Sequence, residues 1–108
     1  MLAVLRDNLE RQVIVEGKRD KEVLCSLGFK KVLTISNGIY ETTEMLKEKD
    51  VLILTDFDRE GSEIAKKLER FLQPIGYRVD IVTRKKVGIM LRKLKILEIE
   101  HLRSVLYE

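Results

Sequence analysis

Short apolar segments alternate with segments of helical periodicity along this chain. Residues 12–15, 31–36, 51–55 and 77–82 are brief runs rich in β-branched and other apolar residues, which predicts four β-strands. The run at 51–55 (V-L-I-L-T) is almost wholly apolar, as expected of a central strand covered on both faces. This alternation predicts an α/β protein of Rossmann-like architecture, with a mainly parallel sheet in the strand order 2-1-3-4.

The segments between the predicted strands place apolar residues at helical spacing. We expect helices from about residue 19 to 28, over 42–49 and over 60–72. Two shorter helical patterns follow the fourth predicted strand, one around Met90, Leu91 and Leu94 and the other around Leu102, Val105 and Leu106.

Length and composition limit the classes of protein that fit. The 108 residues allow one domain, and we expect its core over 12–82 and a basic helical extension over 84–108. With 44% hydrophobic and 36% charged residues the chain is expected to fold as a soluble protein, and without an apolar run or leader it is expected in the cytoplasm, away from membranes. One cysteine and one histidine cannot build a structural zinc site, so any metal must be held by carboxylates.

Charge is unevenly distributed along the chain. The net charge is +3, yet residues 75–108 carry eight Lys/Arg against four Asp/Glu, which leaves residues 1–74 at −1. A basic C-terminal third weakly favours a polyanionic partner. The basic residues of this region fit a phosphate-binding track and a solvated helix face equally well: Arg84, Lys85, Lys86, Arg92, Lys93 and Lys95.

An acidic cluster follows the third predicted strand. Residues 56–61 read D-F-D-R-E-G, at the point where a buried strand turns into a helix. In open α/β sheets the ligand crevice lies at the carboxyl ends of the strands. Carboxylates this close raise one another's pKa unless a cation lies between them. Oxygen ligands without His or Cys favour Mg²⁺, with Mn²⁺ as a substitute.

A second acidic position, Glu16, follows the first predicted strand. If strands one and three are neighbours, Glu16 comes close to Asp56 and Asp58. Gly17 would allow a backbone to approach closely there. Further residues near these strand ends are expected to contact phosphate: Lys18, Asn37, Gly38 and Arg59.

The E-G pair at 16–17 and the D-x-D-x-E-G motif at 56–61 resemble the Toprim domain of type IA topoisomerases, bacterial-type primases, recombination mediators and several nucleases. The resemblance covers about residues 12–82. Three segments, 14–18, 36–38 and 54–56, are most similar to small stand-alone members, among them the nuclease that matures 5S ribosomal RNA. The chain differs from that nuclease at Phe57, where a proline is usual.

The resemblance implies a function and assigns roles to the acids. Glu16 would be the general acid/base, Asp56 and Asp58 would bind Mg²⁺, and Glu60 would support the metal site. The implied activity is nuclease-like phosphodiester chemistry on nucleic acid, with RNA weakly favoured over DNA. The alternative is a non-catalytic or accessory Toprim module that binds nucleic acid or protein in replication, repair or RNA metabolism.

Other interpretations of these residues remain open. A receiver-type phosphoacceptor domain would also have an aspartate at position 56, with Thr83 and Lys85 as switch residues, but its first strand would end in adjacent acids rather than in Glu-Gly. A haloacid-dehalogenase-like phosphatase would place D-x-D after its first strand and needs more chain. Asp58 could cap a helix as well as bind metal, whereas Asp20 fits a helix start better than a fifth site acid, and His101 fits a surface residue.

Overall fold

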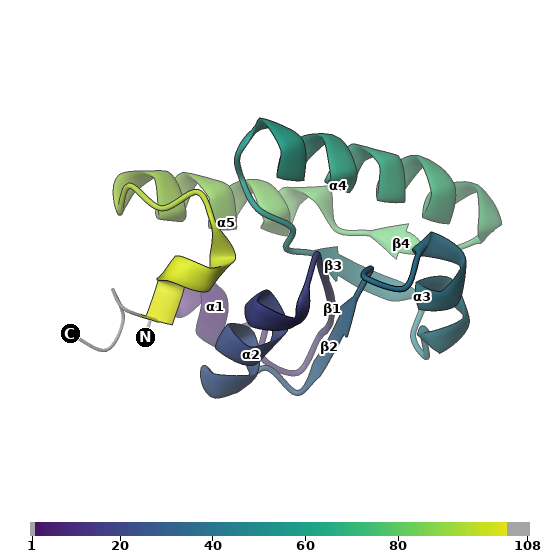
Figure 1. Cartoon of the computed structure of the whole chain (residues 1–108), viewed down its shortest axis with the longest axis horizontal. Coiled ribbons are helices and arrows are strands. Elements are labelled where there is room, and N and C mark those ends of the chain that lie inside the picture. The colour runs from purple at the N-terminus through teal and green to yellow at the C-terminus, as the bar shows by residue number, and fades with distance from the viewer. Residues whose placement is uncertain (1, 104–108) are drawn as a thin grey trace.

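The computed structural model describes residues 2–103, which form a parallel sheet with helices on both faces (Figure 1). The strand order is β2-β1-β3-β4, as the sequence predicted. Val13 of β1 pairs with Val32 of β2 and Leu52 of β3, so β1 and β3 are central neighbours. The strands are β1 (Gln12–Val15), β2 (Lys31–Thr34), β3 (Asp50–Ile53) and β4 (Arg78–Val79).

The predicted helix at 60–72 is confirmed closely, whereas the helix predicted at 42–49 begins three residues earlier and ends at Met45. Within residues 2–103, none of the helices has the length and apolar character that crossing a bilayer requires. The helices are α1 (Ala3–Arg6), α2 (Lys18–Ser26), α3 (Ile39–Met45), α4 (Arg59–Leu72) and α5 (Ile81–Lys93), with 3₁₀ turns at Gln73–Ile75 and Ile99–His101.

Side chains alternate across the central strands and build two cores. Val13 and Val15 of β1 face a core formed with α1, α2, α5 and the segment 96–102. Ile14, between them, faces the opposite core with α3 and α4. All three valine and isoleucine side chains are fully buried, because a central parallel strand is covered on both sides. The two cores therefore place α5 and α4 against opposite faces of the sheet, and Figure 1 shows the two helices near β4.

The fourth strand is shorter than predicted. The apolar run predicted a strand over 77–82, but β4 covers two residues and α5 begins at Ile81. Asp80 ends the strand by capping the helix, since its Oδ1 accepts a hydrogen bond from the Thr83 backbone N–H at 2.9 Å. One helix therefore spans the region of the short pattern around Met90. Of the last predicted pattern, Leu102 follows the second 3₁₀ turn, whereas Val105 and Leu106 lie outside the described residues.

Because β4 is so short, the edge of β3 continues without a strand partner. The Val51 carbonyl still accepts a hydrogen bond from the backbone N–H of Asp80 at 3.0 Å. Beyond it, the Arg84 guanidinium donates to the carbonyls of Ile53 and Thr55, each at 3.0 Å. Arg84 thus satisfies the buried backbone acceptors that a longer fourth strand would have bound.

Candidate metal and nucleic-acid site

The carboxyl ends of β1 and β3 bring Glu16 and Asp56 together. Glu16 Oε1 accepts a hydrogen bond from the Asp56 backbone N–H at 3.0 Å. Burial raises the pKa of Glu16, and the nearby carboxylates of Asp20, Asp58 and Glu60 raise it further against the effect of that hydrogen bond. Burial, with Asp20, Glu16 and Asp58, likewise raises the pKa of Asp56 to about 6. Glu16 and Asp56 therefore lie together as predicted. The nearby carboxylates contribute to the raised pKa values of both acids, as expected where no cation neutralises them.

A C-terminal segment that carries no site motif holds the loop after β3. The Ile99 backbone N–H donates to Asp56 Oδ1 at 2.8 Å, and the Phe57 N–H donates to the Leu97 carbonyl at 2.6 Å. Ile96 and Ile99 are buried in the core, which anchors this segment. The isoleucines in an otherwise basic C-terminal region could have indicated that this segment packs against the core, but no sequence motif linked them to Asp56.

Asp20 belongs both to the start of α2 and to the acidic site. Its Oδ2 accepts a hydrogen bond from the Gly17 N–H at 3.2 Å, as expected of a helix-start residue. Its pKa is raised by burial and then by Glu100 and Glu98, so the acidic region extends to the second 3₁₀ turn. There His101, 58% exposed, lies 3.7 Å from a Glu100 oxygen. Among the described residues, Glu98, Glu100 and His101 form the cluster whose potential ligand atoms lie within 4.8 Å of one another.

Asp58 caps α4, as the alternative interpretation of the motif predicted. Its Oδ1 accepts a hydrogen bond from the Gly61 N–H at 2.7 Å, while Glu60 lies exposed in the first helical turn. The oxygens of Asp56, Asp58 and Glu60 are not gathered as closely as those of the Glu98 cluster. Because Oδ1 of Asp58 caps the helix, Oδ2 is the oxygen that this side chain can offer to a cation.

The residues expected to contact phosphate have different surroundings. Arg84 is set apart from the others, because its guanidinium donates to three backbone carbonyls and lies 4.2 Å from the centre of the Phe57 ring. Burial lowers the pKa of Arg84 to about 10, although Glu16 and Asp56 act in the opposite direction. Arg59 is exposed and pairs with Glu63 at 3.3 Å. The remaining positions lie on the surface or partly exposed at helix starts: Lys18, Asn37, Gly38, Lys85 and Lys86.

The donor set fits a hard divalent cation. Glu16, Asp56 and Asp58 offer carboxylate oxygens, which Mg²⁺ and Mn²⁺ accept as ligands. Burial is the main cause of the raised pKa of Asp56, and repulsion from Asp20, Glu16 and Asp58 adds to it; a cation would remove that repulsion. The cluster is therefore suited to cation binding rather than to a network of ion pairs.

A parallel 2-1-3-4 sheet with Glu-Gly after β1 and D-x-D-x-E-G after β3 defines a class of metal-dependent domain that is linked to nucleic acid. The sequence matches the Toprim domain over residues 11–90, and the chain belongs to this family. Toprim domains bind divalent metals.

Relatives extend this assignment. The chain is 35% identical over 96 residues to a UPF0292 protein from Archaeoglobus fulgidus, covering 89% of this chain and 76% of that protein. It is 38% identical over 87 residues to a UPF0292 protein from Thermococcus onnurineus, but the match covers 65% of that protein. A solved structure of a protein from Aquifex aeolicus is 29% identical, with a TM-score of 0.79, and covers 92% of this chain and 94% of its own. The chain thus spans about two thirds of the length of several UPF0292 relatives.

Proposed function

We propose that the protein carries out Mg²⁺-dependent phosphodiester chemistry on nucleic acid, as a nuclease-like enzyme with RNA as the favoured substrate. The observation that carries the proposal is the contact between Glu16 and the Asp56 backbone at the ends of neighbouring strands. It places a carboxyl group of raised pKa beside the acids of the D-x-D motif. Acids with distinct environments at one site are suited to divide proton transfer from metal binding.

The proposal gives separate tasks to the acids. A divalent cation held by Asp56 and Asp58, with support from Glu60, would neutralise the charge that develops on the phosphate oxygens. Glu16 has Oε1 fixed by the Asp56 N–H, so Oε2 gives or takes the proton of the attacking or leaving oxygen. The Ile99 N–H keeps Oδ1 of Asp56 oriented.

Substitution of Glu16 and Asp56 separates these tasks. Asp56→Asn removes a charged ligand, so we expect it to weaken metal binding and abolish turnover together. Glu16→Gln is expected to keep the metal while lowering the chemical step by roughly 10²- to 10⁴-fold. Calorimetry with Mn²⁺ or Mg²⁺ and single-turnover cleavage measure the two effects. Equal loss of metal in both variants would make Glu16 a ligand, and full turnover in Glu16→Gln would remove its catalytic role.

The substrate class needs its own experiment. Purified protein is incubated with labelled structured RNA and with DNA, with Mg²⁺ or with chelator. We expect Mg²⁺-dependent cleavage of RNA that Asp56→Asn does not support. Binding without cleavage, unchanged in Asp56→Asn, would favour an accessory nucleic-acid-binding module, the alternative that the family membership also allows.

A further inference from the structure

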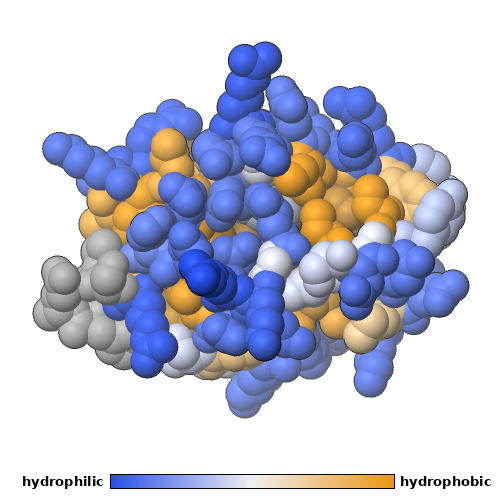
Figure 2. Space-filling view, in the orientation of Figure 1, coloured by the Kyte–Doolittle hydropathy of each residue, from blue (hydrophilic) through white to orange (hydrophobic). Residues whose placement is uncertain are grey.

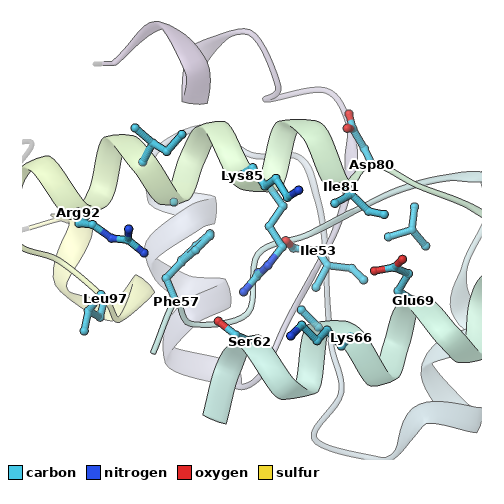
Figure 3. Close-up of a pocket in the computed structure, with 15 residues that line it drawn as sticks. Ile53, Phe57, Ser62, Lys66, Glu69, Asp80, Ile81, Lys85, Arg92 and Leu97 are labelled. Atoms are coloured by element: carbon cyan, nitrogen blue, oxygen red, sulfur yellow. The ribbon is translucent and has the colours of Figure 1, made fainter. Parts of the chain in front are cut away.

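A groove lies between α4 and α5, beside the edge that β4 leaves open. It encloses about 370 Å³, within the range of small-ligand sites. Its floor includes Ile53, Ala65 and Val79, and the Phe57 ring lies near one end (Figure 3). Phe57 stands between Asp56 and Asp58 in the sequence, so one residue that lines the groove is a direct chain neighbour of both acids.

The rim of the groove is mainly basic. Lys66 of α4 and Lys85 and Arg92 of α5 line it, and all three side chains are exposed. The acids that line it are Glu69 and Asp80, which Figure 3 shows away from the Phe57 end. Asp80 is already neutralised by Arg11, whose Nη1 lies 2.6 Å from its Oδ2. The exposed cations of the rim therefore outnumber its acids, one of which is already paired.

Apolar side chains on the groove wall are left uncovered. Ile89 is 57% exposed and Leu97 is 46% exposed, and both line the groove. Figure 2 shows hydrophobic patches among the hydrophilic side chains of one molecular face. An apolar floor with a cationic rim is complementary to a ligand that has a flat apolar part and several negative charges.

We propose that an unpaired stretch of nucleic acid lies in this groove, with a base on the apolar floor and phosphates at Lys66, Lys85 and Arg92. The inference rests on the proposed function, because it supplies a path for a strand that passes Asp56. A paired base could not reach a floor that lies between two helices, so the groove selects single-stranded segments. The expected substrate therefore has unpaired nucleotides next to the reacting phosphate.

The chain supplies a matched control for this proposal. Each cation of the rim is followed in sequence by a lysine that does not line the groove: Lys67, Lys86 and Lys93. These lysines are also exposed and lie on the same two helices. The groove proposal thus assigns Lys86 and Lys93 to the solvated helix face and not to the phosphate track. Replacing either set by glutamine removes the same net charge, so a difference between the two variants reports the groove and not the overall field of the protein.

The test measures binding in chelator of a labelled single-stranded oligonucleotide of about 12 nucleotides. The groove variant, Lys66→Gln with Lys85→Gln and Arg92→Gln, is expected to lose at least about tenfold in affinity and to reduce the salt slope by about 2, since each phosphate contact contributes about 0.7. The control, Lys67→Gln with Lys86→Gln and Lys93→Gln, is expected to lose less than about threefold. Equal losses in the two variants would overturn the proposal. Thermal unfolding verifies that both variants fold.

Two further probes test the base and the class of partner. An abasic strand of equal length is expected to bind roughly fivefold more weakly or worse, because it lacks the base that the floor receives. An abasic strand that binds as tightly, or an acidic glutamate peptide that competes equally, would overturn the proposal. Since binding is measured without metal, its result is independent of cleavage. If the wild-type protein binds the strand in the groove but cleaves no nucleic acid in Mg²⁺, the proposed function is rejected and the groove assignment is retained.

Discussion

The two Glu-Gly pairs of the sequence, at 16–17 and 60–61, look equivalent but differ in why they contain glycine. A Cβ atom at Gly61 would overlap the backbone carbonyl of Asp56. The Thr55 hydroxyl donates to the Gly61 carbonyl at 2.7 Å and holds the start of α4 against the end of β3. Gly17 has an extended backbone, and a Cβ there would meet no atom within 4 Å. The fold itself requires only the second of these two glycines.

Alanine substitution should therefore separate these glycines. Gly61→Ala must push α4 away from the D-x-D loop, so we expect a loss of about 2 kcal/mol or more in the free energy of unfolding. Gly17→Ala is expected to change it by no more than about 0.5 kcal/mol. Urea unfolding of the two variants measures the contrast. Similar stabilities would show that the helix start shifts without cost.

The sequence could predict the acids of the site because they follow parallel strands. Glu16 and Asp56 meet since β1 and β3 are neighbours and their carboxyl ends share one sheet edge. It could not predict the role of Arg84, because that side chain binds the carbonyls exposed by a strand two residues long. Nor could it place Ile99, whose bond to Asp56 spans 43 positions and uses a backbone N–H that has no sequence signature.

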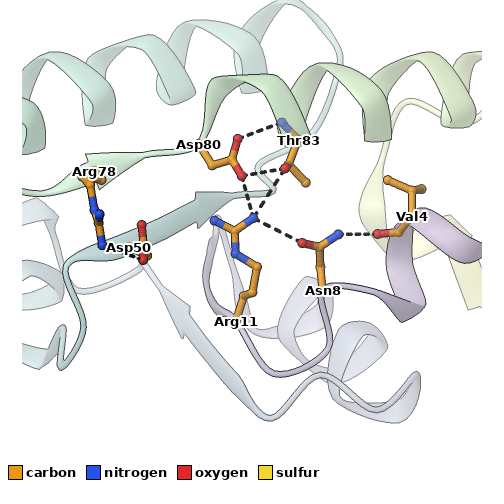
Figure 4. A network of polar contacts seen from close by, with 7 residues as sticks. All are labelled: Val4, Asn8, Arg11, Asp50, Arg78, Asp80 and Thr83. Carbon is orange, nitrogen blue, oxygen red and sulfur yellow. Dashed lines mark hydrogen bonds and ion pairs between the residues drawn. The ribbon is translucent and has the colours of Figure 1, made fainter.

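At the scale of elements, the boundary between β4 and α5 shows why the apolar pattern was misleading. Ile81 and Val82 extend the apolar run after β4, but Val82 is 63% exposed, so the run does not mark a buried strand. Asp80 and Thr83 instead form a helix cap three residues apart. Arg11 and Asn8 join this cap (Figure 4), because Arg11 Nη1 donates to Asn8 Oδ1 at 3.2 Å as well as to Asp80. A contact with a distant segment thus fixes where the helix begins.

This cap predicts a dependence of stability on pH. Burial acts to raise the pKa of Asp80, but hydrogen bonds from Thr83 and Arg11 outweigh it and hold the pKa at about 2, below its model-peptide value of 3.8. A depressed acid stabilises the fold above the unfolded pKa, and this contribution is lost as the pH falls through the folded pKa. Asp80→Asn keeps an oxygen for the Thr83 N–H but removes the charge.

We expect wild type to be more stable than Asp80→Asn by on the order of 1–2 kcal/mol at neutral pH, and this difference to vanish between about pH 4 and pH 2. Urea unfolding at several pH values measures it. Glu63→Gln, which changes an exposed acid that pairs with Arg59, serves as a control with little expected pH-dependent difference. A constant gap between wild type and Asp80→Asn down to pH 2 would show that the ion pair with Arg11 does not set the pKa.

At the scale of the whole molecule, the acidic site joins segments that are distant in sequence. Glu16 follows β1, Asp20 lies in α2, Asp56 follows β3, and Ile99 comes from the C-terminal segment. The raised pKa values of the three acids mean that ionising them in the folded state is unfavourable. Burial is the main cause for each acid and repulsion from nearby carboxylates adds to it. A cation that binds only the folded chain would offset both effects and stabilise all of these segments together.

Mg²⁺ should therefore raise the melting temperature of the wild-type protein. At a metal concentration of about 100 times Kd the gain is about 2.7 kcal/mol, which corresponds to a shift of roughly ten degrees or more for a domain of this size. Asp56→Asn retains an oxygen for the Ile99 N–H and carries one negative charge fewer, so in chelator it should be at least as stable as wild type. It should lose most of the response to Mg²⁺, whereas Glu22→Gln, which changes an exposed acid of α2, should keep it.

Calorimetric scans of the three proteins with metal and with chelator measure these shifts. A response to Mg²⁺ that survives in Asp56→Asn would place the cation elsewhere, and the Glu98, Glu100 and His101 cluster would then be the next group to substitute.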